Sequence, residues 1–136
     1  MKITYGQLRA VYVALQSVMA QKCKFATARR LYDVQTALAR EARWHDEQLL
    51  QIQREYVQLD QAGDPVPARD ADGNPLDGQY VITDPAGYAA RMMELYATET
   101  GELPPLDEDM LTEFEISGEE LSALMMIIGG ENNGGV

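Results

Sequence analysis

The stretch from Ala26 to Ala62 constrains the fold most, because it contains neither Gly nor Pro and carries a seven-residue hydrophobic repeat. One row of the repeat occupies Leu31, Leu38, His45, Ile52 and Leu59. A companion row, four residues further on, occupies Gln35, Ala42, Leu49 and Tyr56. This spacing predicts one long helix that buries a single seam, as in a helical hairpin or a coiled coil.

A shorter helix is predicted before it, from Thr4 to about Ala20, with Thr4 and Gln7 as a capping box. The link over 21–25 is short, which favours an antiparallel pair of helices. At about 1.5 Å per residue, the long helix extends about 55 Å, more than twice the length of the first. The first helix therefore cannot cover the seam beyond His45, which needs the C-terminal half of the chain or another subunit.

The uncovered part of the seam supplies most of the interface candidates, and a Met-rich closing helix supplies the others. The candidates are His45, Leu49, Ile52, Tyr56, Leu59, Met125 and Met126. Methionine side chains fill irregular gaps in cores or form adaptable interfaces, and core packing is the favoured alternative for Met125 and Met126.

Beyond the long helix, Gly63 and Pro65 are typical of a helix end. A β-hairpin is predicted with arms at 66–69 and 79–83 around the turn sequence DADGNPLDG. The elements expected after it are a helix over 84–98 with Asp84 as cap, a half-buried strand over 110–116 and a helix closing at Ile128 with Ser117 as cap.

These elements predict a mainly α (α+β) fold: an N-terminal antiparallel helical hairpin with one long helix, a small antiparallel β-sheet and two further short helices. We expect a single domain over 1–128, with the helical hairpin over 1–62 and the other elements over 63–128. The Gly- and Asn-rich segment over 129–136 is predicted to be a flexible tail.

The net charge of −11 is divided unevenly along the chain. Residues 1–62 hold nine Lys/Arg and six Asp/Glu, whereas residues 63–136 hold two Arg and sixteen Asp/Glu. The acidic half indicates solubility or a docking surface for a basic partner. Direct nucleic-acid binding is not expected, because phosphate neutralisation requires a basic patch.

The sequence carries no catalytic signature, and we expect a protein that is not an enzyme. It has no Gly-rich phosphate loop, no Ser/His/Asp set and no Cys/His spacing. A carboxylate-pair enzyme, which leaves no local signature, is the alternative. Cys23, the single cysteine, is expected to pack at the corner of the hairpin beside Phe25, with a reactive thiol as the alternative.

No cofactor and no metal are expected. His45 is the only histidine, so a core histidine is favoured over a zinc ligand. Asp70, Asp72 and Asn74 resemble the start of a calcium loop, but the closing glutamate is replaced by Val81, and turn chemistry explains the same residues. No apolar run reaches the length of a membrane span, and polar residues interrupt the N-terminal apolar stretch, so we expect neither a membrane segment nor a signal peptide.

Short motifs at both ends resemble those of a family of small bacteriophage and prophage proteins of unknown function. At the start the matching residues are Lys2, Ile3, Thr4, Gly6, Gln7 and Leu8. At the end they are Phe114, Ile116, Ser117, Leu121, Ala123, Leu124 and Met126. The resemblance implies the arrangement of elements given above and a phage origin. It supplies no catalytic residues.

We therefore expect a non-enzymatic phage protein that acts through protein–protein contacts, as a minor virion component of head or tail or as an assembly factor. Its expected partners are phage structural proteins or further copies of itself. The alternative is an acidic inhibitor of a basic host nuclease or defence protein, and a small-molecule-binding module is a third class. The expected location is the host cytoplasm during infection, or the virion.

Overall fold

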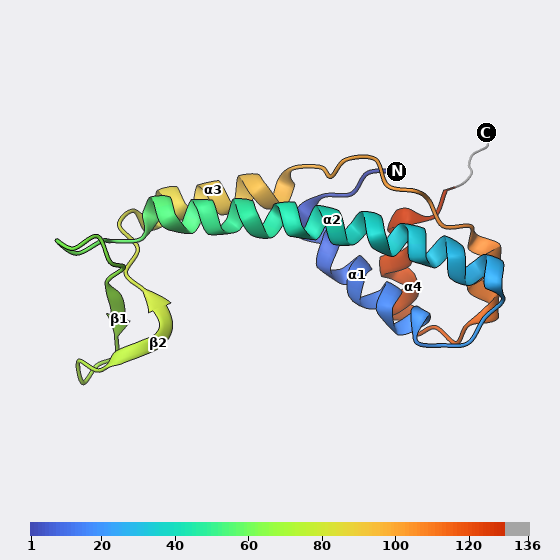
Figure 1. The fold of residues 1–136 in the computed structure, drawn as a ribbon, viewed down its shortest axis with the longest axis horizontal. Helices are drawn as coiled ribbons and strands as arrows, with labels where there is room; N and C mark the ends of the chain where they lie inside the picture. The colour runs from blue at the N-terminus through green and yellow to red at the C-terminus, as the bar shows by residue number, and fades with distance from the viewer. Residues whose placement is uncertain (130–136) are drawn as a thin grey trace. The chain divides into compact units, whose positions relative to one another are not determined.

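A computed structural model describes residues 1–129 of the chain, and the rest of the predicted tail lies outside the described residues. The fold is mainly α with one two-stranded antiparallel sheet, as predicted (Figure 1). The elements in chain order are α1 (Tyr5–Met19), α2 (Phe25–Tyr56), β1 (Pro67–Arg69), β2 (Pro75–Tyr80), α3 (Pro85–Ala97), the 3-10 helix η1 (Glu108–Glu113), α4 (Gly118–Leu124) and the 3-10 helix η2 (Met125–Ile127). Among residues 1–129, no helix is both long enough and apolar enough to cross a bilayer.

Contacts divide the chain into two compact units, with a boundary inside α2. Unit 1 comprises residues 1–45 and the chain from Tyr96 onward, and unit 2 comprises residues 46–95. The boundary between these units differs from the one expected at residue 62, because residues 63–95 group with the last part of α2. The expectation of a single domain stays a prediction.

The core of unit 1 lies where α1, the first part of α2 and α4 meet. Leu15, Leu38 and Leu124 come from these three helices, and each is 0% exposed. The antiparallel pairing of α1 with α2 follows from the seam: Leu31, Val34 and Leu38 recur at three and four residues and so lie on one face. Burying this stripe in one core with Leu15 and its neighbours contributes to the apolar burial that holds the unit together.

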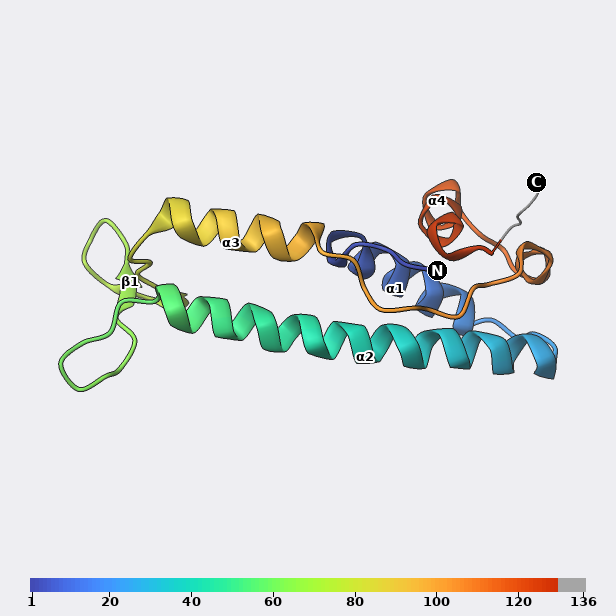
Figure 2. The ribbon, with the colours of Figure 1, turned by 90° about the horizontal axis from the view of Figure 1, so that it is seen from above.

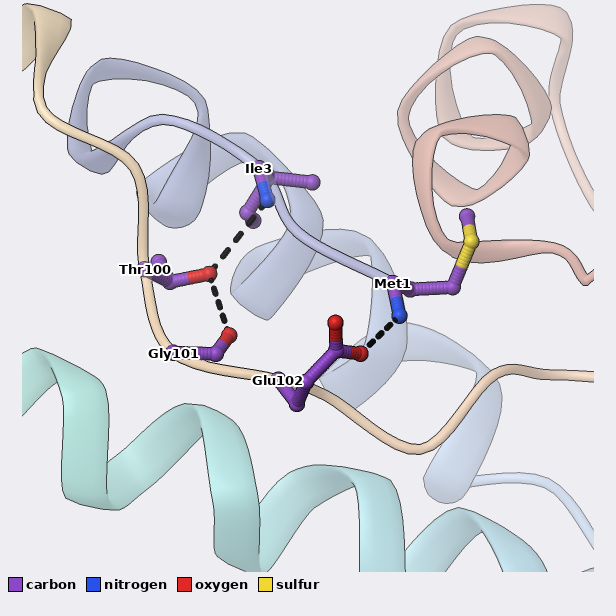
Figure 3. A network of polar contacts seen from close by, with 5 residues as sticks. All are labelled: Met1, Ile3, Thr100, Gly101 and Glu102. Atoms are coloured by element: carbon purple, nitrogen blue, oxygen red, sulfur yellow. Dashed lines mark hydrogen bonds and ion pairs between the residues drawn. The ribbon is translucent and has the colours of Figure 1, made fainter.

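The N-terminal segment of unit 1 pairs with the chain that follows α3 (Figure 3). The Met1 ammonium lies 2.5 Å from the Glu102 carboxylate, and the Ile3 N–H donates to the Thr100 hydroxyl at 3.3 Å. The Thr100 N–H donates back to the Ile3 carbonyl at 2.7 Å. Ile3 and Thr100 are both 3% exposed, so this short ladder satisfies polar groups that would otherwise be buried without partners.

Gly6 follows this ladder, in the first turn of α1. A Cβ at Gly6 would lie 3.2 Å from the backbone carbonyl oxygen of Tyr96, so a larger residue would push the two segments apart. The Gln7 side chain accepts from the Thr4 N–H at 2.9 Å, as the predicted capping box requires. These residues of the N-terminal motif therefore position α1.

In unit 2, α2 ends at Tyr56, whereas the sequence predicts helix as far as Ala62. Val57 and Leu59 are extended and form bridges with Ile82 and Pro65 respectively. The Gln58 N–H donates to the Val81 carbonyl at 2.9 Å. The prediction is wrong at this end because hydrogen bonds to distant extended residues replace those that a further helical turn would form.

The β-hairpin forms with its second arm shifted from the prediction. β1 pairs with β2 in antiparallel register, and β2 already begins at Pro75 rather than at Gln79. The long turn is therefore wrong, because the connection is a tight one over 70–74. Asp70 Oδ1 accepts from the N–H groups of Asp72 and Asn74, both at 2.9 Å, and Gly73 has a φ of +85°. The Asp70 carboxylate thus stabilises the turn by accepting hydrogen bonds from its backbone.

The strand predicted over 110–116 is wrong, because Glu108–Glu113 form the 3-10 helix η1. Leu111 is buried and Phe114 packs against the same core. The Phe114 N–H donates to the Leu111 carbonyl at 3.2 Å, a local contact of the 3-10 type, whereas a strand residue would bond to a neighbouring strand. The helix α4 begins as predicted: the Ser117 hydroxyl accepts from the Glu120 N–H at 3.0 Å, and the Glu120 carboxylate accepts from the Ser117 N–H at 2.9 Å.

Glu113, at the end of η1, caps the start of α2. Its carboxylate accepts from the Lys24 N–H at 3.1 Å and from the Thr27 hydroxyl. The hydrogen bond from the Thr27 hydroxyl, followed by that from the Lys24 N–H, holds the pKa of the Glu113 carboxyl below its usual range. Phe25, in the same turn, is 81% exposed, so the prediction that it packs at the corner is wrong.

The Glu113→Gln variant is expected to unfold at a lower temperature than the wild type at pH 7. Because the pKa is lower in the folded state, the carboxylate's contribution is fully present above the ordinary glutamate pKa of about 4.3 and is lost as pH falls through the folded pKa. Thermal unfolding between pH 7 and pH 3 checks this: the gap between variant and wild type narrows at the acid end. Glu115→Gln, at an exposed position, is the matched control. A gap that stays constant with pH would contradict the assignment.

Candidate functional site

The end of the α2 seam is partly covered by the chain itself, through α3 (Figure 2). Ile52 is only 4% exposed. Tyr56 is half-buried and its ring meets that of Tyr88 edge-on, with centroids 5.9 Å apart. The Arg91 guanidinium donates to both carboxylate oxygens of Glu55, at 3.0 and 3.2 Å. For Ile52 and Tyr56, cover therefore comes from the C-terminal half of the chain, which is one of the two alternatives that the sequence left open.

His45 lies in unit 1, within a cluster of aromatic rings. Its ring stacks on Tyr5 and on Tyr96, with centroids 5.7 Å away in each case. The Tyr5 hydroxyl donates to Glu41 at 2.6 Å, and burial together with this carboxylate raises the pKa of the Tyr5 phenol. The cluster joins the start of α1 to α2, which gives His45 a packing role.

The remaining interface candidates differ in exposure. Leu49 is half-buried, whereas Leu59 is 54% exposed. Met126 packs against the core of unit 1, as the core alternative predicts, and Met125 is 50% exposed. The structure therefore places Leu59 and Met125 in separate units and leaves both available for contacts.

Leu59 lies at an open groove of about 760 Å³ within unit 2. The end of α2, the extended residues that follow it, the end of β2 and the start of α3 form its walls. The lining residues are Leu50, Gln53, Arg54, Val57, Leu59, Gly63, Pro65, Gly78, Gln79, Tyr80, Ile82 and Tyr88. Its volume lies within the range of about 300–1,000 Å³ that is typical of ligand sites, and most of its lining is apolar or aromatic.

Three large apolar side chains of the groove are exposed, although each comes from a different segment. Leu50 is 47%, Leu59 54% and Tyr80 47% exposed. Exposed apolar side chains are ordinary when they are scattered, but a contiguous set of them in a concave site indicates a binding surface. We call these three residues, with the rest of the lining, the apolar groove.

Arg54 is the only charged residue among those that line the apolar groove. The other two arginines of unit 2 are engaged: Arg91 pairs with Glu55, and Arg69 donates to the Gly73 carbonyl at 2.8 Å. Within residues 1–129, the Arg54 side chain has no hydrogen-bond or ion-pair partner. Its five N–H donors are therefore available to an acceptor that enters the groove.

Within residues 1–129, no group of three His, Cys, Asp or Glu side chains is arranged so that it could hold a metal ion. Asp70 uses its Oδ1 in the turn, which agrees with the turn interpretation of the calcium-like sequence. Asp60 forms the same kind of turn, because its Oδ1 accepts from the N–H groups of Ala62 and Asp64. The Asp60 and Asp70 carboxylates therefore both stabilise turns of unit 2.

Sequence reasoning found Leu59 but missed the other main groove residues. Leu50 and Arg54 lie outside the two heptad rows, so the repeat did not select them. Tyr80 was expected within a hairpin arm, with no sign of what it would face. Long-range backbone contacts bring these segments together, among them the pairing of Val57 with Ile82 and the hydrogen bond from Gln58 to Val81. No local pattern predicts these contacts.

No protein-family model matches this chain, and no curated protein or solved structure matches it either.

Proposed function

We propose that the protein acts without catalysis, by binding another protein through the apolar groove, in the service of a bacteriophage. The observation that carries this proposal is the exposure of Leu50, Leu59 and Tyr80 around one concave site. Burying apolar area of this kind against a partner provides the favourable free energy of most protein–protein association. The resemblance of the terminal motifs to phage proteins supports the biological setting.

Within that setting, the proposed role is that of a minor virion component or an assembly factor, with phage structural proteins as partners. Quantitative mass spectrometry of purified phage particles separates the two roles. A virion component is present at a fixed number of copies per particle. An assembly factor is absent from particles but binds a structural protein in infected cells.

The groove is tested by comparing the wild type with Leu59→Asp in the same infected-cell pull-down. The variant places a charge in the apolar groove, so it is expected to lose the structural protein that the wild type retains. Leu121→Asp, at another exposed apolar position (43% exposed), is the control and is expected to retain it. Equal recovery by wild type and Leu59→Asp would contradict binding through the groove.

A second candidate function, inhibition of a basic host protein, is favoured by the acidic surface of unit 1. Asp107, Glu108 and Asp109 are consecutive and exposed at the start of η1. Residues 96–129 contain nine Asp/Glu and no Lys or Arg. Binding through such a surface is strongly salt-dependent. A host partner recovered at low salt and lost at about 0.5 M salt would support this function, and an empty low-salt pull-down would count against it.

A further inference from the structure

We infer that the apolar groove recognises a peptide segment in which one acidic side chain is flanked by apolar residues, with Arg54 as the group that binds the carboxylate. This inference rests on the proposed function and specifies the chemistry of the partner. It starts from the composition of the groove lining, which combines apolar walls with one guanidinium.

The charge of the groove lining selects an acidic group. None of the ten Asp/Glu of residues 46–95 lines the groove, and two of the three arginines in this range already have partners within unit 2. Arg54 is exposed and its side chain is unpaired among the described residues. A guanidinium binds a carboxylate through two parallel hydrogen bonds, which gives both affinity and orientation. No other side chain that lines the groove carries a charge to compete for the ligand.

The position of Arg54 along α2 selects an internal acidic side chain rather than a chain terminus. Leu50 lies four residues before Arg54 and Val57 lies three residues after it, so all three share one face of the helix end. Apolar surface therefore continues on both sides of the guanidinium. A carboxylate held there has apolar contacts available before and after it, which fits an acidic residue within an apolar segment.

The groove also suits a peptide because two glutamines in its lining supply amide groups. Gln53 and Gln79 offer side-chain donors and acceptors. A peptide brings backbone N–H and C=O groups that need such partners once water is displaced.

The test is a selection of random dodecapeptides displayed on a surface, using the full chain as wild type, Arg54→Glu, Leu59→Asp and Arg43→Glu. The wild type and the control Arg43→Glu, which alters an exposed arginine of unit 1, are expected to enrich peptides with one Asp or Glu between apolar residues. Arg54→Glu is expected to enrich Lys or Arg at the same place. Leu59→Asp is not expected to enrich the peptide pattern that the wild type enriches.

The outcomes separate this inference from the function on which it rests. The wild type could enrich apolar peptides without an acidic residue. If Arg54→Glu enriches the same peptides and Leu59→Asp does not, the carboxylate specificity is overturned and the groove remains the binding site. Enrichment unaffected by Leu59→Asp would overturn the groove itself. For one synthetic selected peptide, changing its acidic residue to the amide is expected to weaken binding to the wild type roughly tenfold. The same change is expected to have no effect on binding to Arg54→Gln, and equal weakening for both proteins would overturn the role of Arg54.

Discussion

Leu38→Ala is expected to lower the free energy of unfolding by about 2–5 kcal/mol. Leu38 is 0% exposed, on the α2 stripe that packs against the fully buried Leu15 and Leu124. Truncation removes the transfer free energy of the side chain and leaves a cavity that three helices cannot fully close. Urea unfolding followed by circular dichroism measures the loss.

The matched control is Arg40→Ala, two residues further along α2 at an exposed position. Its effect should stay within about 0.5 kcal/mol, since it removes no buried contact. A loss for Leu38→Ala no larger than that of the control would mean that the seam is not the core of unit 1.

Ile52→Asp and Leu59→Asp are expected to differ sharply, although both residues belong to the same heptad row. Ile52 is 4% exposed within unit 2, so an aspartate there loses apolar burial and places a charge away from water, at a cost of about 4 kcal/mol or more. Leu59 is 54% exposed, and Leu59→Asp should change stability by less than about 0.5 kcal/mol. Hydrogen exchange of α3 together with urea unfolding measures both effects.

Protein concentration distinguishes coverage by the same chain from coverage by a second subunit. If α3 covers Ile52 within one chain, the stability of the wild type and of both variants is independent of concentration. A wild-type midpoint that rises with concentration, together with similar losses for both variants, would show that a neighbouring subunit covers the seam instead. Self-association stays a proposal, and coverage of Ile52 and Tyr56 does not depend on it.

The heptad rows predicted the helical hairpin well, because periodicity reports which face of a helix is apolar. It does not report what covers that face, and α3 could not be assigned to Ile52 from the sequence. The error at 110–116 has a similar origin. Leu111 and Phe114 are three residues apart, and a short segment of mixed polarity fits a strand and a 3-10 helix about equally well.

Long-range polar contacts also could not be predicted from the sequence. Glu113 lies in the segment over 110–116 that was predicted to be a strand, yet it caps α2 from 89 residues away. The sequence did not single out Arg54, and its place between Leu50 and Val57 in a groove gives it a candidate role. By contrast, the caps at Ser117 and Asp84 were predictable because their partners lie within three residues.

The residues that carry the resemblance to phage proteins serve mainly the fold. Thr4 and Gln7 form a helix cap, Gly6 permits the approach of Tyr96, and Leu124 is fully buried in the core of unit 1. None of the motif residues lines the apolar groove. The inference about partner binding therefore depends on the groove alone, and measurements on the groove can test it independently of the phage setting.

Binding through the apolar groove is tested most directly by calorimetric titration of one selected acidic–apolar peptide into the wild type and into Leu59→Asp. We expect Leu59→Asp to unfold like the wild type but to bind the peptide at least about tenfold more weakly, because a charge has entered the apolar groove beside the incoming carboxylate. Equal affinity of the two proteins for the peptide would contradict it.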